Sequence, residues 1–383
     1  MTTGPDAAAG PWERRQRVRA AVVDERSAPF TVEDVQLERP RPNEVRVRMV
    51  ATGICHTDLA VRDRFLPTPM PIVLGHEGAG VIEEVGSDVR SVRPGDHVVL
   101  GYAFCGECPS CTAGKPAYCV HRGVLRYGGT RPDGSHTLRR AGGELYGSFF
   151  GQSSFAEYAL ADERFVVPVP GDAPLEYLGP LGCSVQTGVG SVLAALRPDP
   201  GASLAVFGTG PVGMSAVLGA GLAGCDPIIA VDLRPGRLQL ARELGATHTV
   251  NPTEDDPVIA IRDLTGGGAA FSVETTAVPT VLRAAVDSLG IRGRCGTVGV
   301  APAGAEASFE MNTLLFGRSV QGILLGDRVP REFVPELVDL HLAGKLPFDR
   351  FCRFYELDRI NEAVAATEGD GEVLKPLVTF GRT

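Results

Sequence analysis

The sequence predicts an α/β protein in which a β-rich first part is followed by a doubly wound parallel sheet. In residues 18–185, short apolar segments are separated by glycine and proline, as is typical of strands joined by turns. From about Thr187, apolar runs alternate with helical stretches, which is the rhythm of buried parallel strands connected by helices. A length of 383 residues suits two or three domains.

We expect three segments along the chain, 1–185, 186–326 and 327–383, with the last one returning to the first domain. The predicted strands are residues 44–49, 80–85, 97–100, 203–207, 228–231 and 377–380. The predicted helices are residues 237–244, 279–289 and 332–343.

Composition limits the possible partners. The chain has 37 basic and 46 acidic side chains and a net charge of -9, which argues against electrostatic binding of nucleic acid. The first ten residues lack the apolar core of a signal peptide, and no later stretch has eighteen uninterrupted apolar residues. We therefore expect a cytoplasmic protein that acts on a small molecule and does not bind a membrane. In that reducing compartment, its nine cysteines are better metal ligands than disulfide partners.

A glycine-rich turn follows the predicted strand at 203–207 and precedes a helical stretch of small residues. In Gly208-Thr209-Gly210-Pro211-Val212-Gly213, the glycines allow a tight turn and a close approach of backbone amides to a pyrophosphate. Asp232 ends the next apolar run, where its carboxylate would accept hydrogen bonds from an adenosine ribose and repel a 2'-phosphate. These features predict a Rossmann domain that prefers NAD to NADP, although the cations Arg234 and Arg237 would tolerate a phosphate.

Four cysteines with short spacing predict a structural zinc site. Cys105, Cys108 and Cys111 are each two residues apart, and Cys119 follows eight residues later. One loop can wrap four such thiolates around a tetrahedral ion and leave no open position for substrate. His121 is close enough in sequence to compete as a ligand, but four cysteines complete the coordination.

A second zinc site would need three protein ligands and an open position. Cys55, His76 and Cys183 supply two thiolates and an imidazole if the fold brings them together. Taken singly, each of these residues would more often be an ordinary core or loop residue.

Several motifs together carry a resemblance to the zinc-dependent medium-chain alcohol dehydrogenases, over nearly the whole chain after Arg15. In addition to the four-cysteine loop and the nucleotide turn, the matching motifs are Gly53-Ile54-Cys55-His56-Thr57-Asp58, Leu74-Gly75-His76-Glu77-Gly78-Ala79-Gly80, Pro94-Gly95-Asp96-His97-Val98, Leu181-Gly182-Cys183 and Lys375-Pro376-Leu377-Val378-Thr379-Phe380. Within the family, Val61-Arg62-Asp63, Phe150-Gly151-Gln152-Ser153-Ser154-Phe155 and residues 182–188 look most like aryl (benzyl) alcohol dehydrogenases.

The resemblance implies a GroES-like β catalytic domain with an inserted Rossmann domain, and an active site in the cleft between them. It implies that Cys55, His76 and Cys183 hold a catalytic zinc ion. Glu77 is expected beside the ion as a transient ligand, and Asp58 is expected to orient His76. Plain structural hydrogen bonding is the alternative for both carboxylates.

The resemblance also assigns roles around the cofactor and the reacting alcohol. Thr57 matches the hydroxyl that takes the alcohol proton, and the position three residues later, a histidine in many relatives, is Ala60. The proton is therefore expected to leave through ribose and water. The residues expected to contact NAD are His56 and Lys375 at the pyrophosphate, Arg237 near the adenosine ribose, and Thr187 and Val212 at the nicotinamide.

The sequence also supports expectations about the substrate and the oligomeric state. Tyr102, Phe149 and Phe150 map near the family's substrate channel, where an uncharged aromatic lining suits a benzylic or allylic alcohol, although aromatic residues here would equally suit a domain core. The long loop at residues 120–154 favours a homodimer, because dimeric relatives share this length.

The sequence thus predicts an enzyme with two zinc ions per chain that interconverts a primary aryl or allylic alcohol and its aldehyde by hydride transfer to NAD. One alternative is a thiol-dependent formaldehyde dehydrogenase that oxidises an S-hydroxymethyl adduct. Another is a non-catalytic NAD(H)-binding module, for which an open zinc site would have no purpose.

Overall fold

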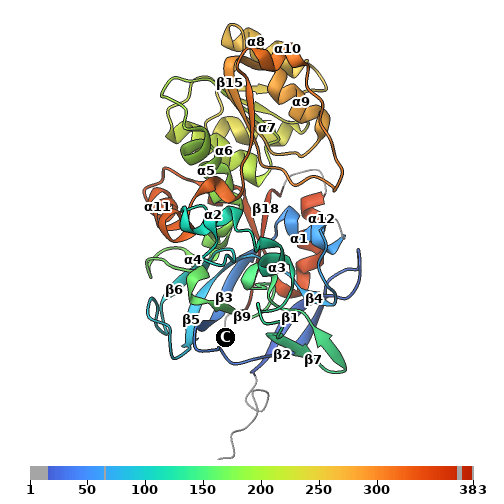
Figure 1. Ribbon diagram of the computed structural model, residues 1–383, viewed down its shortest axis with the longest axis vertical. Coiled ribbons are helices and arrows are strands. Elements are labelled where there is room, and N and C mark those ends of the chain that lie inside the picture. Colours follow the sequence, from blue (N-terminus) through green and yellow to red (C-terminus); the bar gives the residue numbers. More distant parts are fainter. Residues whose placement is uncertain (1–15, 64–65, 369–372, 382–383) are drawn as a thin grey trace, which may run out of the picture.

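A computed structural model describes residues 16–63, 66–368 and 373–381 of the chain. The first fifteen residues, on which part of the expected localisation rests, lie outside the described residues. Two halves are stacked along the long axis of the molecule, and the strand β18 (Lys375–Thr379) lies near the level at which they meet (Figure 1).

The first half contains two sheets of mainly antiparallel strands. The five-stranded sheet has the order β4-β1-β2-β7-β8, and the seven-stranded sheet has the order β10-β6-β5-β3-β18-β17, with β9 also paired to β3. The strands are β1 (Gln16–Val23), β2 (Thr31–Leu37), β3 (Glu44–Gly53), β4 (Ile72–Val73), β5 (Glu77–Val85), β6 (His97–Leu100), β7 (Leu138–Arg140), β8 (Gly143–Leu145), β9 (Tyr158–Asp162), β10 (Val166–Pro168) and β17 (Cys352–Glu356). Strand β3 is held along its length by antiparallel pairing with β5, β9 and β18.

Helices occupy the connections of this half. They are α1 (His56–Arg62), α2 (Pro109–Thr112), α3 (Arg122–Tyr127), α4 (Leu175–Leu178), α5 (Ser184–Gly190), α11 (Pro330–Leu342) and α12 (Ile360–Glu368). Helix α5 crosses the expected domain boundary at residue 185 and continues into a π-helical stretch, Ser191–Leu196.

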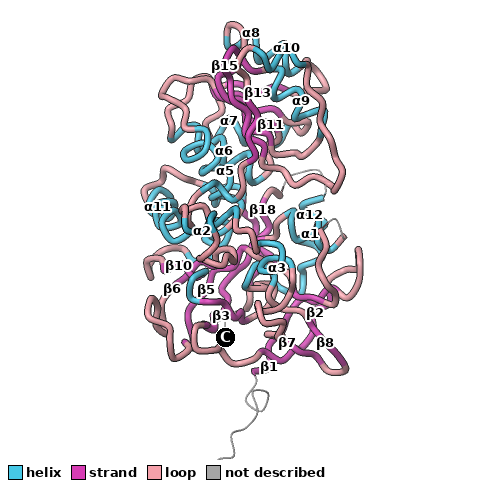
Figure 2. The backbone as a smooth tube through the Cα atoms, in the orientation of Figure 1, coloured by secondary structure: helices cyan, strands magenta, loops and turns pink. Residues whose placement is uncertain are grey.

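The second half is the predicted parallel sheet, with helices packed around it (Figure 2). All its pairings are parallel, in the order β13-β12-β11-β14-β15-β16. The strands are β11 (Leu204–Phe207), β12 (Ile228–Val231), β13 (His248–Val250), β14 (Ala269–Glu274), β15 (Leu289–Thr297) and β16 (Ser319–Gly322). The helices are α6 (Pro211–Leu222), α7 (Pro235–Glu243), α8 (Pro257–Thr265), α9 (Pro279–Asp287) and α10 (Met311–Leu315). The strand order reverses between β11 and β14, which is where doubly wound sheets bind their ligands.

The end of the chain returns to the first half. Strand β18 pairs antiparallel with β3, with Leu377 opposite Gly53, and parallel with β17. One hydrophobic core joins the halves, because Val99 of β6 and Leu181 belong to the same buried cluster as Val206 of β11. The predicted GroES-like and Rossmann architecture is thus confirmed.

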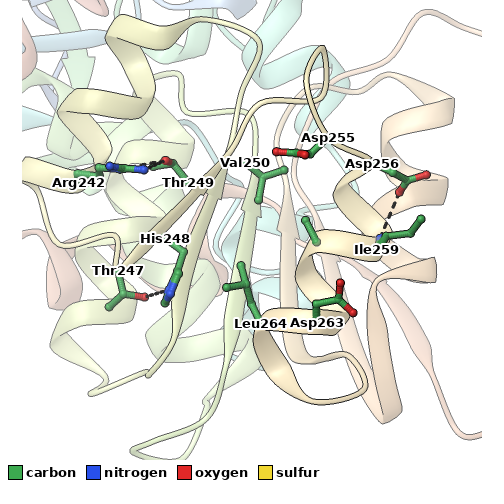
Figure 3. A pocket seen from close by; sticks show the side chains of 11 residues that line it. Arg242, Thr247, His248, Thr249, Val250, Asp255, Asp256, Ile259, Asp263 and Leu264 are labelled. Carbon is green, nitrogen blue, oxygen red and sulfur yellow. Dashed lines mark hydrogen bonds between the residues drawn. The ribbon is translucent and has the colours of Figure 1, made fainter.

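Two further observations concern the lengths of the helices and a pocket in the second half. Within the described ranges, no helix has both the length and the apolar character needed to cross a bilayer. A pocket of about 530 Å³ lies between β13 and α8, and neither group of candidate metal ligands lines it (Figure 3).

Candidate active site

The three predicted ligands of a catalytic metal meet at the junction of the halves. Cys55 is the N-cap of α1, His76 precedes β5, and Cys183 is the N-cap of α5. One ligand atom from each of these residues and from Glu77 lies within 4.8 Å of all the others, and Cys183 Sγ is 3.3 Å from His76 Nε2. Zinc–sulfur bonds of about 2.3 Å and zinc–nitrogen bonds of about 2.0 Å at tetrahedral angles require ligand separations of roughly 3.5–3.8 Å. The donor set and its spacing therefore fit zinc.

Asp58 holds this arrangement together. Its carboxylate accepts hydrogen bonds from Cys55 N (2.9 Å) and Gly75 N (3.1 Å), and it lies 2.9 Å from His76 Nδ1. The contact to Nδ1 leaves Nε2 directed at the two sulfurs, because the ring must then use its other nitrogen as the ligand. The predicted orienting role of Asp58 has the required geometry.

Burial and neighbouring charges set the protonation of the ligands. A hydrogen bond from the Cys183 thiol lowers the pKa of Cys55, and the same bond, with burial, raises the pKa of Cys183. Burial opposes a charged imidazole, but the Asp58 carboxylate and the Cys55 thiolate outweigh it and raise the pKa of His76. Protons therefore compete with a metal ion for this site.

Aromatic rings surround His76. Phe150 stacks on the imidazole with ring centroids 4.5 Å apart, and Phe149 meets it edge-on at 5.6 Å. Both phenylalanines thus lie beside the ligands, as predicted for a substrate region. Tyr102, predicted in the same region, donates its hydroxyl to Arg328 O, and its ring lies under the Arg126 guanidinium. The rings of Tyr102, Phe149 and Phe150 are all buried in one hydrophobic cluster with Cys183.

Lys375, predicted at the pyrophosphate, has hydrogen-bond partners inside the protein. Its ammonium group donates to Ile54 O (2.9 Å) and to both carboxylate oxygens of Glu77 (2.9 and 3.1 Å), and both side chains are fully buried. All three N–H bonds of Lys375 are thus used inside the protein. Gly53 makes room for the pair, because a Cβ atom there would lie 2.1 Å from Glu77 Oε2.

Gln152 is a functional neighbour that the sequence did not single out. Its side chain donates to His76 O (3.0 Å) and Gly101 O (2.9 Å) and accepts from Gly78 N (3.1 Å). It thereby fixes the backbone on both sides of Glu77. In the sequence, the role of Gln152 is indicated only by its place in the motif that resembles the aryl alcohol dehydrogenases.

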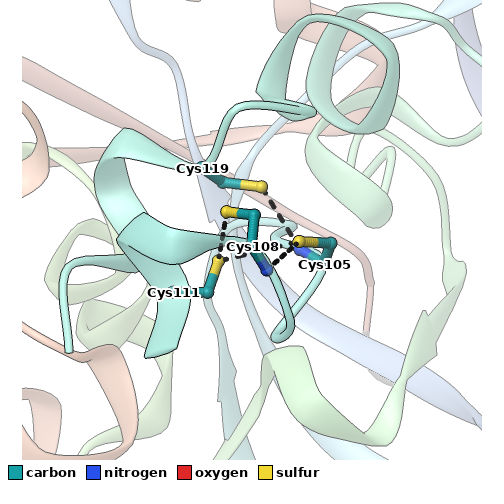
Figure 4. A group of neighbouring side chains, drawn as sticks. All are labelled: Cys105, Cys108, Cys111 and Cys119. Carbon is teal, nitrogen blue, oxygen red and sulfur yellow. Dashed lines mark hydrogen bonds between the residues drawn. The ribbon is translucent and has the colours of Figure 1, made fainter. Parts of the chain in front are cut away.

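The four cysteines of the loop at 105–119 converge on one point (Figure 4). The Sγ atom of Cys111 lies 3.5 Å from that of Cys108 and 3.9 Å from that of Cys105. These spacings match a tetrahedral zinc–thiolate site, whose sulfur atoms are about 3.8 Å apart. Backbone hydrogen bonds lower the pKa of Cys108 to about 6, which favours the thiolate that a metal binds.

The predicted nucleotide turn joins β11 to α6. Gly208 has a φ of 83°, and a Cβ atom at Gly213 would lie 1.8 Å from Gly208 O, so both positions require glycine. A Cβ atom at Gly210 would meet nothing within 4 Å, which leaves space over the helix start for a ligand. The chain thus fits a dinucleotide at the point where the strand order reverses.

Asp232 lies beside this turn. Its carboxylate accepts from Thr209 N (2.7 Å), Thr209 Oγ1 (2.9 Å) and Arg234 N (3.0 Å). The Arg237 guanidinium is 3.9 Å from it, and Arg237 Nε is buried without a partner. The acidic residue is therefore fixed at the expected ribose position, with a cation next to it.

The remaining predicted contacts lie around the same junction. Thr187 of α5 donates to Cys183 O, and Val212 of α6 packs close by, since a Cβ atom at Gly188 would lie 2.2 Å from Val212 O. His56 and Thr57 begin α1 directly after the Cys55 ligand, where His56 is exposed and Thr57 is half-buried.

This constellation defines a zinc-binding oxidoreductase with a dinucleotide site. Residues 41–171 match the model of the alcohol dehydrogenase GroES-like domain, and residues 211–342 match that of the zinc-binding dehydrogenase domain.

Three relatives illustrate the similarity. A geraniol dehydrogenase from Castellaniella defragrans is 45% identical over 94% of this chain and 97% of its own. The crystal structure of an alcohol dehydrogenase zinc-binding domain protein from Burkholderia ambifaria is 51% identical, with a TM-score of 0.94 over 96% of this chain and all of its own. That of benzyl alcohol dehydrogenase from Acinetobacter calcoaceticus is 44% identical, with a TM-score of 0.93 over the same shares. The chain belongs to the zinc-dependent medium-chain alcohol dehydrogenases, and it interconverts alcohols and aldehydes.

Proposed function

We propose that this enzyme oxidises a primary aryl or allylic alcohol to its aldehyde, reversibly, with NAD as the hydride acceptor. The observation that carries the proposal is the convergence of Cys55, His76 and Cys183 beside the rings of Phe149 and Phe150. Zinc bound by two thiolates and one imidazole supplies a Lewis acid that lowers the pKa of an alcohol hydroxyl.

Residues of the chain would accept the hydroxyl proton and hold the ligands and the nicotinamide in position. We propose that Thr57, two residues after the Cys55 ligand, accepts the hydroxyl proton, and that Asp58 keeps the His76 ring in its ligand orientation. Glu77 is restrained by Lys375 and by Ser184 N, at 3.2 Å from its carboxylate. Hydride transfer requires the reacting carbon to lie against the nicotinamide, which we place near Thr187 and Val212.

We propose NAD rather than NADP because Asp232 presents a carboxylate at the expected ribose position. A 2'-phosphate there would meet a like charge and lose the ribose hydrogen bond. Asp232→Gly should shift the ratio of kcat/KM for NADP to that for NAD upward by at least tenfold, and Arg237 would then attract the phosphate.

We propose an aryl or allylic substrate because two phenylalanine side chains line the ligand set and because the named relatives include a geraniol dehydrogenase and a benzyl alcohol dehydrogenase. Such a surface suits an uncharged, unsaturated group. A substrate that carries a charged thiol adduct would need cations or polar groups there.

A panel of primary alcohols assayed by NADH absorbance tests the proposal. We expect kcat/KM for benzyl, cinnamyl and geranyl alcohols to exceed that for ethanol by at least tenfold. Cys183→Ala should lose turnover and one of two zinc ions per chain. Activity confined to formaldehyde plus a small thiol would favour the thiol-dependent alternative, and turnover by Cys183→Ala at the wild-type rate would contradict the catalytic zinc assignment.

We also propose that the enzyme works in the cytosol as a homodimer. Strand β16 is an edge of the parallel sheet, and large apolar side chains are exposed beside it, including Ile291, Met311 and Leu315. Unpaired edges and apolar patches favour association of two copies about a two-fold axis. Light scattering should give twice the chain mass for the wild type and the single chain mass for Leu315→Glu.

A further inference from the structure

The four-cysteine loop contacts the segment that connects the two halves. After β16, the chain passes through residues 324–328 before it enters α11. Lys115 of the loop forms an ion pair with Asp327 at 2.7 Å, and the hydroxyl of Tyr118 accepts a hydrogen bond from Leu324 N at 3.3 Å. Figure 1 shows α2, which belongs to this loop, beside α5 and α11.

The backbone of this segment has an unusual conformation. Leu325, Gly326 and Asp327 have φ values of 51°, 74° and 57°, and the left-handed region is unfavourable for the two that carry side chains. A sparsely populated conformation persists only where the surroundings fix it. Residues of the loop supply contacts at both ends of this run, through Tyr118 and Lys115.

The segment in turn touches the active site. A Cβ atom at Gly326 would lie 2.2 Å from Gln186 O of α5, so the two backbones are in close contact. Leu325 is buried in the same hydrophobic cluster as Cys183 and Phe149. A shift of this segment would therefore disturb the backbone contact with α5, which begins directly after Cys183, and the hydrophobic cluster that contains Cys183.

We propose that Lys115 and Tyr118 are positioning residues, through which the four-cysteine loop fixes residues 324–328 and thereby the apolar surroundings of the bound alcohol. The proposal rests on the proposed function for its effect on the alcohol, but the contact itself can be tested without turnover. A loop held by four thiolates is a rigid support for such contacts.

Hydrogen exchange of the zinc-replete enzyme, followed by mass spectrometry, tests the contact. In Tyr118→Phe and in Lys115→Met, peptides that cover residues 320–329 should exchange about fivefold faster, and in the double variant more than tenfold faster. The matched controls are Tyr177→Phe and Lys345→Met, which remove the same groups elsewhere on the surface and should leave these peptides unchanged.

Kinetics test the positioning role. The double variant should keep two zinc ions per chain and raise the KM for benzyl alcohol at least threefold, while kcat changes less than twofold. Unchanged exchange at 320–329, or equal acceleration in the controls, would overturn the contact. Faster exchange with an unchanged KM would overturn the positioning role. A wild-type enzyme that oxidises none of the alcohols would refute the proposed function instead, and the exchange result would still stand.

Discussion

Removal of the buried ammonium group of Lys375 gives the sharpest test of the site as described. In Lys375→Met, the apolar stem is kept while the positive charge and three hydrogen bonds to Ile54 O and Glu77 are lost. Since both side chains of the pair are at most 1% exposed, the Glu77 carboxylate would remain in the interior without its lysine counter-charge and would keep the hydrogen bond from Ser184 N. Breaking a buried pair in this way costs about 3–5 kcal/mol.

The measurement is urea unfolding with excess zinc, followed by circular dichroism. Lys375→Met should lower the free energy of unfolding by about 3–5 kcal/mol. The double variant Lys375→Met/Glu77→Gln should recover about 2 kcal/mol of that loss, because no buried charge is left unpaired. Lys345→Met, at an exposed position, is the control and should change stability by less than about 0.5 kcal/mol.

The result also decides between two roles for Lys375. If the ammonium group served the pyrophosphate, as the family resemblance predicts, the variant would bind NAD at least tenfold more weakly and keep its stability. A stability loss below about 1 kcal/mol would therefore refute the buried-pair argument.

Three further predictions concern the metal sites. Asp58→Asn should weaken zinc binding at the His76 site by about 10–100-fold in chelator competition and leave the other zinc ion in place, and equal retention of both ions would contradict its orienting role. Gly53→Ala should lower stability by about 1–3 kcal/mol in urea unfolding, since the new Cβ atom displaces the Glu77 carboxylate; a neutral result would show that the carboxylate has another position. Cys111→Ser should lower the zinc content by one ion per chain in elemental analysis, and two retained ions would argue against a four-thiolate site.

The local pattern of apolar and turn residues was sufficient to predict many of the strands and helices. Strands β6 and β12 have the predicted bounds, because turn residues or charges flank their apolar runs. The helix predicted at 279–289 ends at Asp287, since Leu289 already begins β15. Strands β7 and β8 were not predicted, because each has only three residues and β7 also depends on pairing with the distant strand β2.

In the site, too, some features could be predicted from the sequence and others depend on packing. Motif spacing identified the four-cysteine group, and the family resemblance identified the group of Cys55, His76 and Cys183, as candidate metal ligands that the fold brings together. Neither predicted the hydrogen-bond partners of Lys375 and Tyr102, which depend on packing between segments far apart in the chain. Family resemblance identifies which position in the sequence corresponds to a functional residue. It does not predict the hydrogen-bond partner of a long side chain, because that partner depends on the neighbouring residues in the folded structure.

The antiparallel pairing of β18 with β3 has a consequence for biosynthesis. The carboxylate of Glu77 is made early by the ribosome, and its counterion comes from the last strand to be synthesised. Without that strand, the Glu77 carboxylate would lack its lysine partner beside Cys55, His76 and Cys183. Assembly of the metal centre in its final form therefore requires β18, although none of the candidate metal ligands belongs to that strand.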